Sequence, residues 1–180
     1  MFARRTYIAL LCALCFKTSI SCSSITQDIF TATRDKSKAL KNYLKLAVLH
    51  LKLGNNSKVR IFINKAIYLD KNYPPIYNVA GLLHLSEENY PVAQENFIQA
   101  VHLDKHFYAA INNYALTLSL LGNVQSALLR LHDLLKQNLY TNIADVYYNR
   151  AFLNYLINPQ VALQDIQMAL NIDNTPVNYH

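Results

Sequence analysis

The chain of 180 residues has no tryptophan, three glycines and five prolines. So few glycines exclude collagen-like and glycine-rich low-complexity chains, and the few turn-forming residues argue against a β-sandwich. Charged residues make up only 16% of the chain and hydrophobic residues 52%. This balance excludes an intrinsically disordered chain, so the sequence predicts one ordinary folded domain.

Cysteine is confined to the first 22 residues, at Cys12, Cys15 and Cys22. No disulfide framework can therefore hold the rest of the chain together. Two arginines near the N-terminus precede an apolar run over residues 8–16, and small residues follow. This order is typical of a secretory signal, and the run is shorter than the ~20 residues that span a bilayer. We predict a signal peptide at residues 1–21.

The segment Ser19-Ile20-Ser21-Cys22 resembles a bacterial lipobox, in which the cysteine becomes the lipidated first residue of the mature protein. Cys22 would be the only cysteine left after cleavage. Because Ser23 rather than an aspartate follows it, the resemblance implies an anchor in the bacterial outer membrane, facing the periplasm. The alternatives are a soluble periplasmic or inner-membrane-anchored protein, and a cytosolic protein with an apolar start.

A phrase of six residues repeats along the chain at a spacing of 34. Residues 66–71 (AIYLDK) recur as residues 100–105 (AVHLDK), and residues 169–173 (ALNID) repeat the phrase one residue out of phase. Self-similarity at this period is the signature of a helix–turn–helix solenoid. It defines four repeats at residues 40–73, 74–107, 108–141 and 144–173.

Small and large apolar residues recur at fixed positions in these repeats. Helix A of each repeat carries a small residue at Ala47, Gly81, Ala115 and Ala151. Helix B carries a small or aliphatic residue at Val59, Ala93, Ala127 and Ala162, then a large one at Ile63, Phe97, Leu131 and Ile166, then Ala66, Ala100, Leu134 and Ala169. The pattern resembles the tetratricopeptide repeat (TPR), which implies an all-α, right-handed superhelical solenoid of about four units.

The positions of the prolines and glycines agree with the helix boundaries that these repeats predict. Pro74, Pro75, Pro91 and Pro159 stand where helices would begin, where proline is tolerated. We predict helix pairs at residues 41–53/57–70, 75–87/91–104, 109–121/124–137 and 144–157/159–172. Residues 22–39 are predicted to form a polar, lipid-anchored tether with a frayed helix start, and residues 174–180 a C-terminal tail.

No catalytic constellation is visible. Three glycines cannot supply a phosphate-binding loop, and the dinucleotide and nucleophile-elbow motifs are absent. We therefore predict no enzyme activity and no cofactor. The four-residue spacing of His102 and His106 could suggest a metal site, but no third ligand stands nearby. Contacts of these histidines with the last carbonyl groups of the helix are the favoured interpretation, so no metal site is predicted. His50 and His84 occupy equivalent positions, which favours packing.

Basic residues gather in the first repeat. Residues 23–71 contain ten Lys or Arg against three Asp, whereas residues 72–180 contain four basic and eight acidic residues. A basic segment beside a lipid anchor is attracted to an anionic surface, by about 1 kcal/mol per residue; a solvated helix face is the equally open alternative. Basic residues are not interleaved with aromatics along a groove, so nucleic acid is not a predicted partner.

TPR solenoids expose the inner face of each helix A along a concave groove. We predict that this groove binds an apolar or amphipathic protein segment, with asparagines bonding its backbone. Some of these side chains would instead pack into neighbouring helices. The predicted positions are Leu44, Val48, Leu51, Asn78, Leu82, Leu85, Asn112, Leu116, Ser119, Tyr148, Phe152 and Tyr155.

The last predicted helix carries a second apolar line at Val161, Met168 and Ile172, beside the inward Ala162, Ile166 and Ala169. Solenoids usually finish with a polar capping helix. An uncapped apolar end predicts self-association or a partner surface.

Three stretches carry a closer resemblance: residues 42–47 (NYLKLA) with Leu53-Gly54-Asn55, residues 112–115 (NNYA), and the Leu139-Tyr140 junction before residues 146–149 (VYYN). They resemble the type IV pilus biogenesis/stability TPR lipoproteins, the secretin pilotins of PilF/PilW type. The resemblance implies a non-enzymatic factor that helps the secretin subunit reach the outer membrane and multimerise. The alternative is a periplasmic TPR scaffold for envelope enzymes such as those that remodel peptidoglycan.

Overall fold

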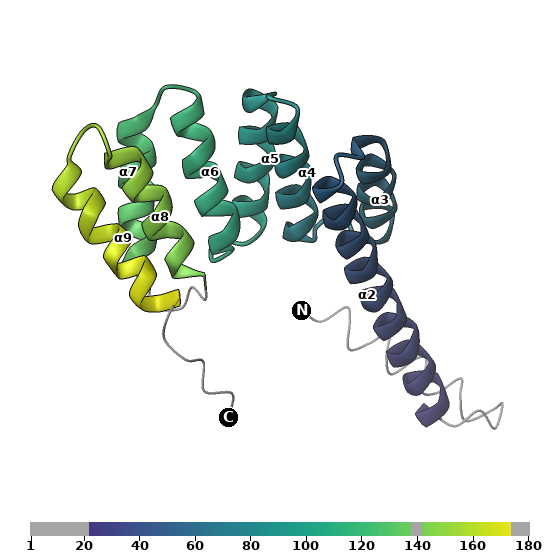
Figure 1. The fold of residues 1–180 in the computed structure, drawn as a ribbon. Coiled ribbons are helices and arrows are strands. Elements are labelled where there is room, and N and C mark those ends of the chain that lie inside the picture. Colours follow the sequence, from purple (N-terminus) through teal and green to yellow (C-terminus); the bar gives the residue numbers. More distant parts are fainter. Residues whose placement is uncertain (1–21, 138–141, 174–180) are drawn as a thin grey trace. The chain divides into compact units, whose positions relative to one another are not determined.

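The computed structural model describes residues 22–137 and 142–173, which are helical and contain no strand (Figure 1). The predicted signal peptide at residues 1–21 and tail at residues 174–180 lie outside the described residues. The chain divides into two compact units, Met1–Asn42 and Tyr43–His180. The helices are α2 (Cys22–Lys52), α3 (Asn56–Leu69), α4 (Pro74–Ser86), α5 (Tyr90–Leu103), α6 (Tyr108–Leu120), α7 (Val124–Leu135), α8 (Ile143–Asn154) and α9 (Pro159–Asp173).

Helices α3 to α9 lie where the repeat predicted them, with ends displaced by at most three residues. The helices of a pair pack on each other, as in α4 with α5, α6 with α7 and α8 with α9. The first helix of each later pair also packs on the second helix of the pair before it. This is the neighbour-to-neighbour stacking expected of a solenoid.

The segment of residues 22–39, predicted as a tether with a frayed helix start, is helical, because α2 already begins at Cys22. The stretch from Cys22 to Leu53 contains neither glycine nor proline, so nothing in the backbone stops the helix of the first repeat from extending toward the N-terminus. Residues 33–38 are all exposed, which is why their sequence is polar.

Small residues line the contacts between helices. Ala47, Ala115 and Ala151 are buried, and Gly81 in α4 faces the ring of Phe97 in α5. A Cβ on Gly81 would lie 2.5 Å from Cε1 of that ring, closer than real Cβ atoms approach. The small residue therefore admits the largest fully buried side chain in the described chain.

The predicted large core positions are filled in three repeats and not in the fourth. Ile63, Phe97 and Leu131 are at most 6% exposed, but Ile166 is 39% exposed. The prediction that Ile166 points inward is wrong. Asp165, one residue earlier, is the buried side chain of α9, because it forms an ion pair with Arg150 of α8.

The turn between the two helices of a pair contains a residue in the left-handed backbone conformation. Gly54 and Gly122 have φ angles of 69° and 83°, a region open to glycine without steric cost. Glu88 takes this role in the second repeat with φ of 56°. Prolines 74, 91 and 159 stand in the first two positions of α4, α5 and α9.

Candidate functional site

The twelve positions predicted to line a groove lie on α2, α4, α6 and α8, and we call them the first-helix face. Leu44 and Asn112 are buried, at 8% and 6% exposure, so these two side chains pack inside the protein. Three aromatic side chains of α8 and its C-terminal cap are exposed: Tyr148 at 37%, Phe152 at 77% and Tyr155 at 68%. The other seven are half-buried, namely Val48, Leu51, Asn78, Leu82, Leu85, Leu116 and Ser119.

Asparagines join successive first helices. Nδ2 of Asn113 in α6 donates to Oδ1 of Asn78 in α4 at 2.9 Å, and Nδ2 of Asn149 in α8 donates to Oδ1 of Asn112 in α6 at 3.0 Å. The amide oxygens expected to meet a peptide backbone are therefore already bonded to the next repeat. A ligand N–H would compete with an internal hydrogen bond at both sites.

The two asparagines that donate these hydrogen bonds were not predicted from the sequence. Asn113 and Asn149 stand one position after Asn112 and Tyr148, which occupy equivalent places in their repeats. Two asparagines at equivalent places next to a first-helix position were the available signal.

Tyr148 occupies the place of Asn112 in the fourth repeat, and its hydroxyl donates to Oδ2 of Asp173 in α9 at 3.1 Å. Partial desolvation, and then the hydrogen bond to Asp173, raise the pKa of Tyr148 above its ordinary value.

Four large apolar side chains at the end of α8 and just beyond it are more than half exposed, and we call them the α8 patch. Its members are Phe152, Tyr155, Leu156 and Ile157, with the last two 87% and 55% exposed. Leu156 and Ile157 were not predicted. The turns of the other repeats contain a glycine or acidic residues, at Gly54, Glu87 to Glu88 and Gly122, whereas the turn after α8 contains neither. A turn without a glycine or a charge was the available signal.

A buried ion pair joins α8 to α9. Arg150 donates from Nη2 to Oδ1 of Asp165 at 2.6 Å and from Nε to Oδ2 at 2.8 Å. The hydrogen bond to Asp165 raises the pKa of Arg150 despite its partial burial. The guanidinium also lies over the ring of Tyr147, 5.8 Å from its centroid. The two-point contact orients α8 and hence the aromatic side chains on it.

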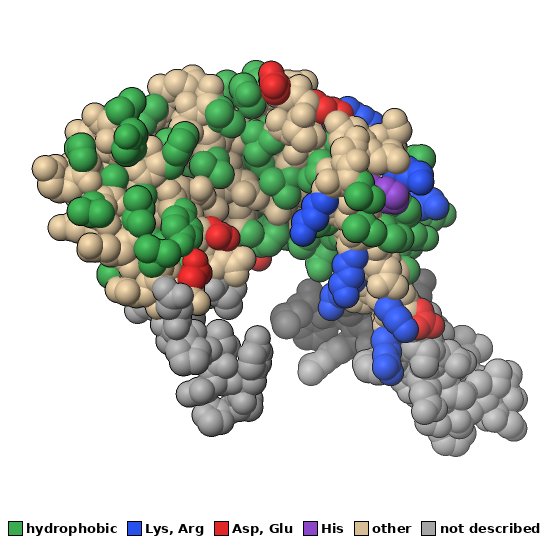
Figure 2. All heavy atoms as spheres, in the orientation of Figure 1, with side chains coloured by type: hydrophobic (Ala, Val, Ile, Leu, Met, Phe, Trp, Pro, Cys, Tyr) green, Lys and Arg blue, Asp and Glu red, His purple; other side chains and the backbone are tan. Residues whose placement is uncertain are grey.

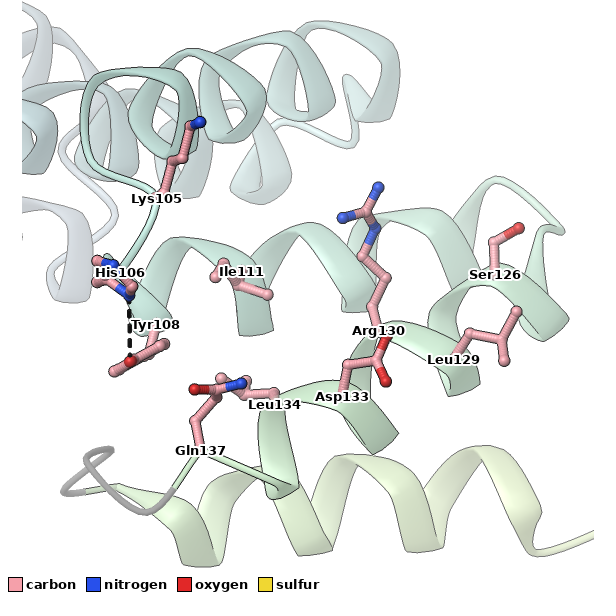
Figure 3. A pocket seen from close by; sticks show the side chains of 10 residues that line it. All are labelled: Lys105, His106, Tyr108, Ile111, Ser126, Leu129, Arg130, Asp133, Leu134 and Gln137. Atoms are coloured by element: carbon pink, nitrogen blue, oxygen red, sulfur yellow. Dashed lines mark hydrogen bonds between the residues drawn. The ribbon is translucent and has the colours of Figure 1, made fainter.

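A cavity of about 580 Å³ is lined by side chains of α6, of α7 and of the segment before α6 (Figure 3). Lys105 and His106 precede α6, and Arg130 and Asp133 come from α7. The Tyr108 hydroxyl lies 3.4 Å from Nδ1 of His106 within it. None of the twelve predicted residues lines this cavity.

The histidines of the first two repeats pack between helices, as predicted. The His50 ring stacks on Phe62 with centroids 5.6 Å apart. Nδ1 of His84 is buried without a hydrogen bond, and lies 3.5 Å from Oε2 of Glu87. His102 and His106 are exposed, and the part of the chain that the structure describes holds no group of three or more metal-ligating side chains.

Among residues 22–137 and 142–173, no helix combines the length and the apolar character needed to cross a bilayer. Cys22 is the first residue of α2. Whether it carries a lipid is a prediction from the sequence alone.

Comparison with known proteins gives similarity in structure only: no protein-family model and no curated protein matches the chain. PilF of Pseudomonas aeruginosa is similar with a TM-score of 0.71 at 20% identity, over 77% of this chain and 63% of that one. PilW, a widely conserved type IV pilus biogenesis factor, gives 0.68 at 16% identity, over 75% and 62%. The second TPR domain of human RPAP3, solved with an HSP70 peptide, gives 0.50 at 13% identity, over 75% and 98%.

These similarities confirm the predicted fold, a TPR solenoid built only of helices in the part that the structure describes. The chain spans less than two thirds of the length of the PilF and PilW structures. At these identities the comparison defines the fold, and function must be argued from the surface.

Proposed function

We propose that this chain is a non-enzymatic, protein-binding assembly factor of type IV pilus biogenesis that assists outer-membrane localisation and multimerisation of the secretin. Support comes from the fold, which is shared with PilF and with the type IV pilus biogenesis factor PilW. The observation that carries the binding role is the α8 patch, because exposed large apolar side chains gathered on one short segment mark a partner surface.

The ligand that fits this surface is an apolar or amphipathic segment of the secretin subunit. Phe152 and Tyr155 present large rings that can be buried at low entropic cost, as interface hot spots do. The half-buried leucines of α4 and α6, Leu82 and Leu116, continue the apolar first-helix face beyond α8. No cationic side chain is among the twelve positions, so a carboxylate-clamp mode is disfavoured.

The proposal includes a lipid on Cys22 that holds the protein at the periplasmic face of the outer membrane. The helix that starts at Cys22 carries exposed basic residues shortly afterwards, at Arg34, Lys36 and Lys38. Each cation near an anionic surface would add on the order of 1 kcal/mol to membrane attachment.

The test is an immunoblot for detergent-resistant secretin multimers in outer membranes of a strain that lacks the protein. We expect the multimers to be lost, and to return with the wild-type gene but not with Phe152→Glu. Leu129→Glu is the matched control, because Leu129 is 65% exposed on α7 and lies outside the first-helix face. Cys22→Ala separates the anchor from the binding surface and is expected to strand the protein in the soluble periplasm.

Unchanged multimers in the deletion strain would refute the secretin assignment. Altered cell shape or hydrolase levels in the same strain would then indicate the other client class, the envelope enzymes.

A further inference from the structure

The last described repeat exposes the face that, in the third repeat, the first helix of the next repeat covers. Ile166 of α9 occupies the position that Phe97 and Leu131 hold in the second and third repeats, where both are fully buried. Leu131 is buried in a cluster with Val146 of the next first helix, and Leu153 of that helix packs against the same cluster. Ile166 is 39% exposed, and its neighbours along α9, Leu163 and Leu170, are 59% and 46% exposed. We call these three residues the tail face.

The apolar line predicted on α9 is thus displaced. Met168 is 45% exposed, whereas Val161 and Ile172 are half-buried, and Val161 lines a small recess with Arg150. The repeat register identifies the tail face as the surface on which a further first helix would pack. Apolar side chains are visible over α9 in Figure 2.

The first repeat has a complementary open face. Leu49 of α2 stands 34 residues before Leu83 and 68 before Thr117, which are 1% and 0% exposed. Leu49 itself is 51% exposed, and Leu46 on the same side of α2 and Leu53 directly after the helix are 38% and 68% exposed. We call these three leucines the head face. In the register of the repeats Leu49 corresponds to Leu153, the residue that packs against the Leu131 cluster.

Charge makes the two faces complementary. Residues 43–69, which carry the head face, contain five basic residues and no acidic one. Residues 142–173, which carry the tail face, contain three acidic residues and one basic residue, for a net charge of −2. Because Arg150 pairs with the buried Asp165, the remaining acidic residues are Asp145 and Asp173. Lys and Arg side chains crowd the α2 region in Figure 2. Opposite charge speeds encounter and sets the orientation of docking.

We propose that the occupant of the tail face is the head face of a second copy of this chain, with Leu49 of one copy on Ile166 of the other as Leu153 lies on the Leu131 cluster. The contact continues the solenoid from copy to copy. It is heterologous, so it builds chains or closed rings rather than symmetric dimers. This inference does not depend on the secretin as client, because neither face includes the α8 patch.

The experiment is native mass spectrometry of the full chain, released from a mild detergent that keeps the apolar N-terminal segment in solution. Wild type is expected to form dimers and larger species as its concentration rises. Leu49→Glu blocks only the head and Ile166→Glu only the tail, so each variant alone should stay monomeric, with a dissociation constant raised about tenfold or more. Their equimolar mixture should form dimers and stop there, because each variant retains one intact face.

Leu129→Glu is the control and should assemble as wild type does, and circular dichroism checks that every variant is folded. If Ile166→Glu unfolds, Leu163→Glu replaces it, since Leu163 is more exposed. The proposal is overturned if wild type remains monomeric at every concentration. It is also overturned if the mixture of folded variants fails to dimerise, or if single variants assemble like wild type; a different protein would then be the occupant.

Discussion

Breaking the Arg150–Asp165 pair should lower the free energy of unfolding more than breaking any other single interaction in the fourth repeat. Asp165 is 2% exposed and Arg150 19% exposed, and Nη2 of Arg150 lies 2.6 Å from Oδ1 of Asp165. Removing one partner of a buried pair leaves an uncompensated charge and typically costs about 3–5 kcal/mol. Because the guanidinium can partly regain water, we expect Asp165→Asn to cost about 3 kcal/mol.

The matched control is the pair between Arg60 and Glu87, which joins α3 to the end of α4. Its Nη2–Oε2 distance is also 2.6 Å, but the side chains are 50% and 24% exposed. An exposed pair contributes about 0–1 kcal/mol, so Glu87→Gln should be nearly neutral. The two acid-to-amide changes therefore remove pairs with the same shortest distance but different burial. Both contacts to Glu87 come from Nη2 of Arg60, whereas Asp165 receives one from Nη2 and one from Nε of Arg150.

Hydrogen–deuterium exchange of the α9 amides is the assay of choice, because a solenoid loses its terminal repeat before the others. A cost of about 3 kcal/mol corresponds to roughly a hundredfold faster exchange in α8 and α9, with α4 and α5 unchanged. The double variant Arg150→Leu/Asp165→Leu should recover most of the loss, since apolar replacement of a buried pair is often neutral or stabilising. Equal effects of Asp165→Asn and Glu87→Gln would refute the reasoning from burial.

Three further predictions follow from packing, hydrogen bonding and titration. Gly81→Ala should destabilise by about 1–3 kcal/mol in urea unfolding, although alanine favours a helix, because its Cβ meets the ring of Phe97; Phe97→Leu in the same chain should recover part of this. Asn149→Ala leaves the buried Oδ1 of Asn112 without its donor, and should lower stability by about 1–3 kcal/mol in the same assay, whereas Asn149→Gln should be milder. The pKa of Tyr148 is raised above 10.0 in the folded state, so its contribution to stability is complete below pH 10.0 and is lost as the pH rises through the folded-state pKa. Tyr148→Phe should remove that pH dependence, and equal alkaline unfolding of the two chains would contradict it.

Repetition made the fold predictable. The phrase at residues 66–71 and its copy at residues 100–105 set the period, and the prolines marked the helix starts, so seven helices were placed within three residues. The start of α2 was not predictable from the repeat, because it precedes the first copy of the pattern. Polar composition there suggests a tether, although a chain free of glycine and proline can continue a solvated helix.

The candidate site was predicted less well than the fold. A helical register assigns a side chain to a face, and Tyr148, Phe152 and Tyr155 are indeed exposed. Their binding role stays a prediction. It does not say what lies opposite that face. Asn112 was therefore predicted as a ligand contact, whereas its oxygen accepts a hydrogen bond from Asn149 in the next repeat.

The repeat, the helix class and the small-to-large packing pattern could be predicted from the amino-acid order, because these features depend on residues close together in the chain. Which side chains have a packing partner became visible in the folded molecule. Ile166 and Leu131 occupy the same place in the pattern, yet one is exposed and the other buried. The burial of a side chain depends on which other parts of the molecule pack against it. A repeat pattern of 34 residues does not specify those contacts.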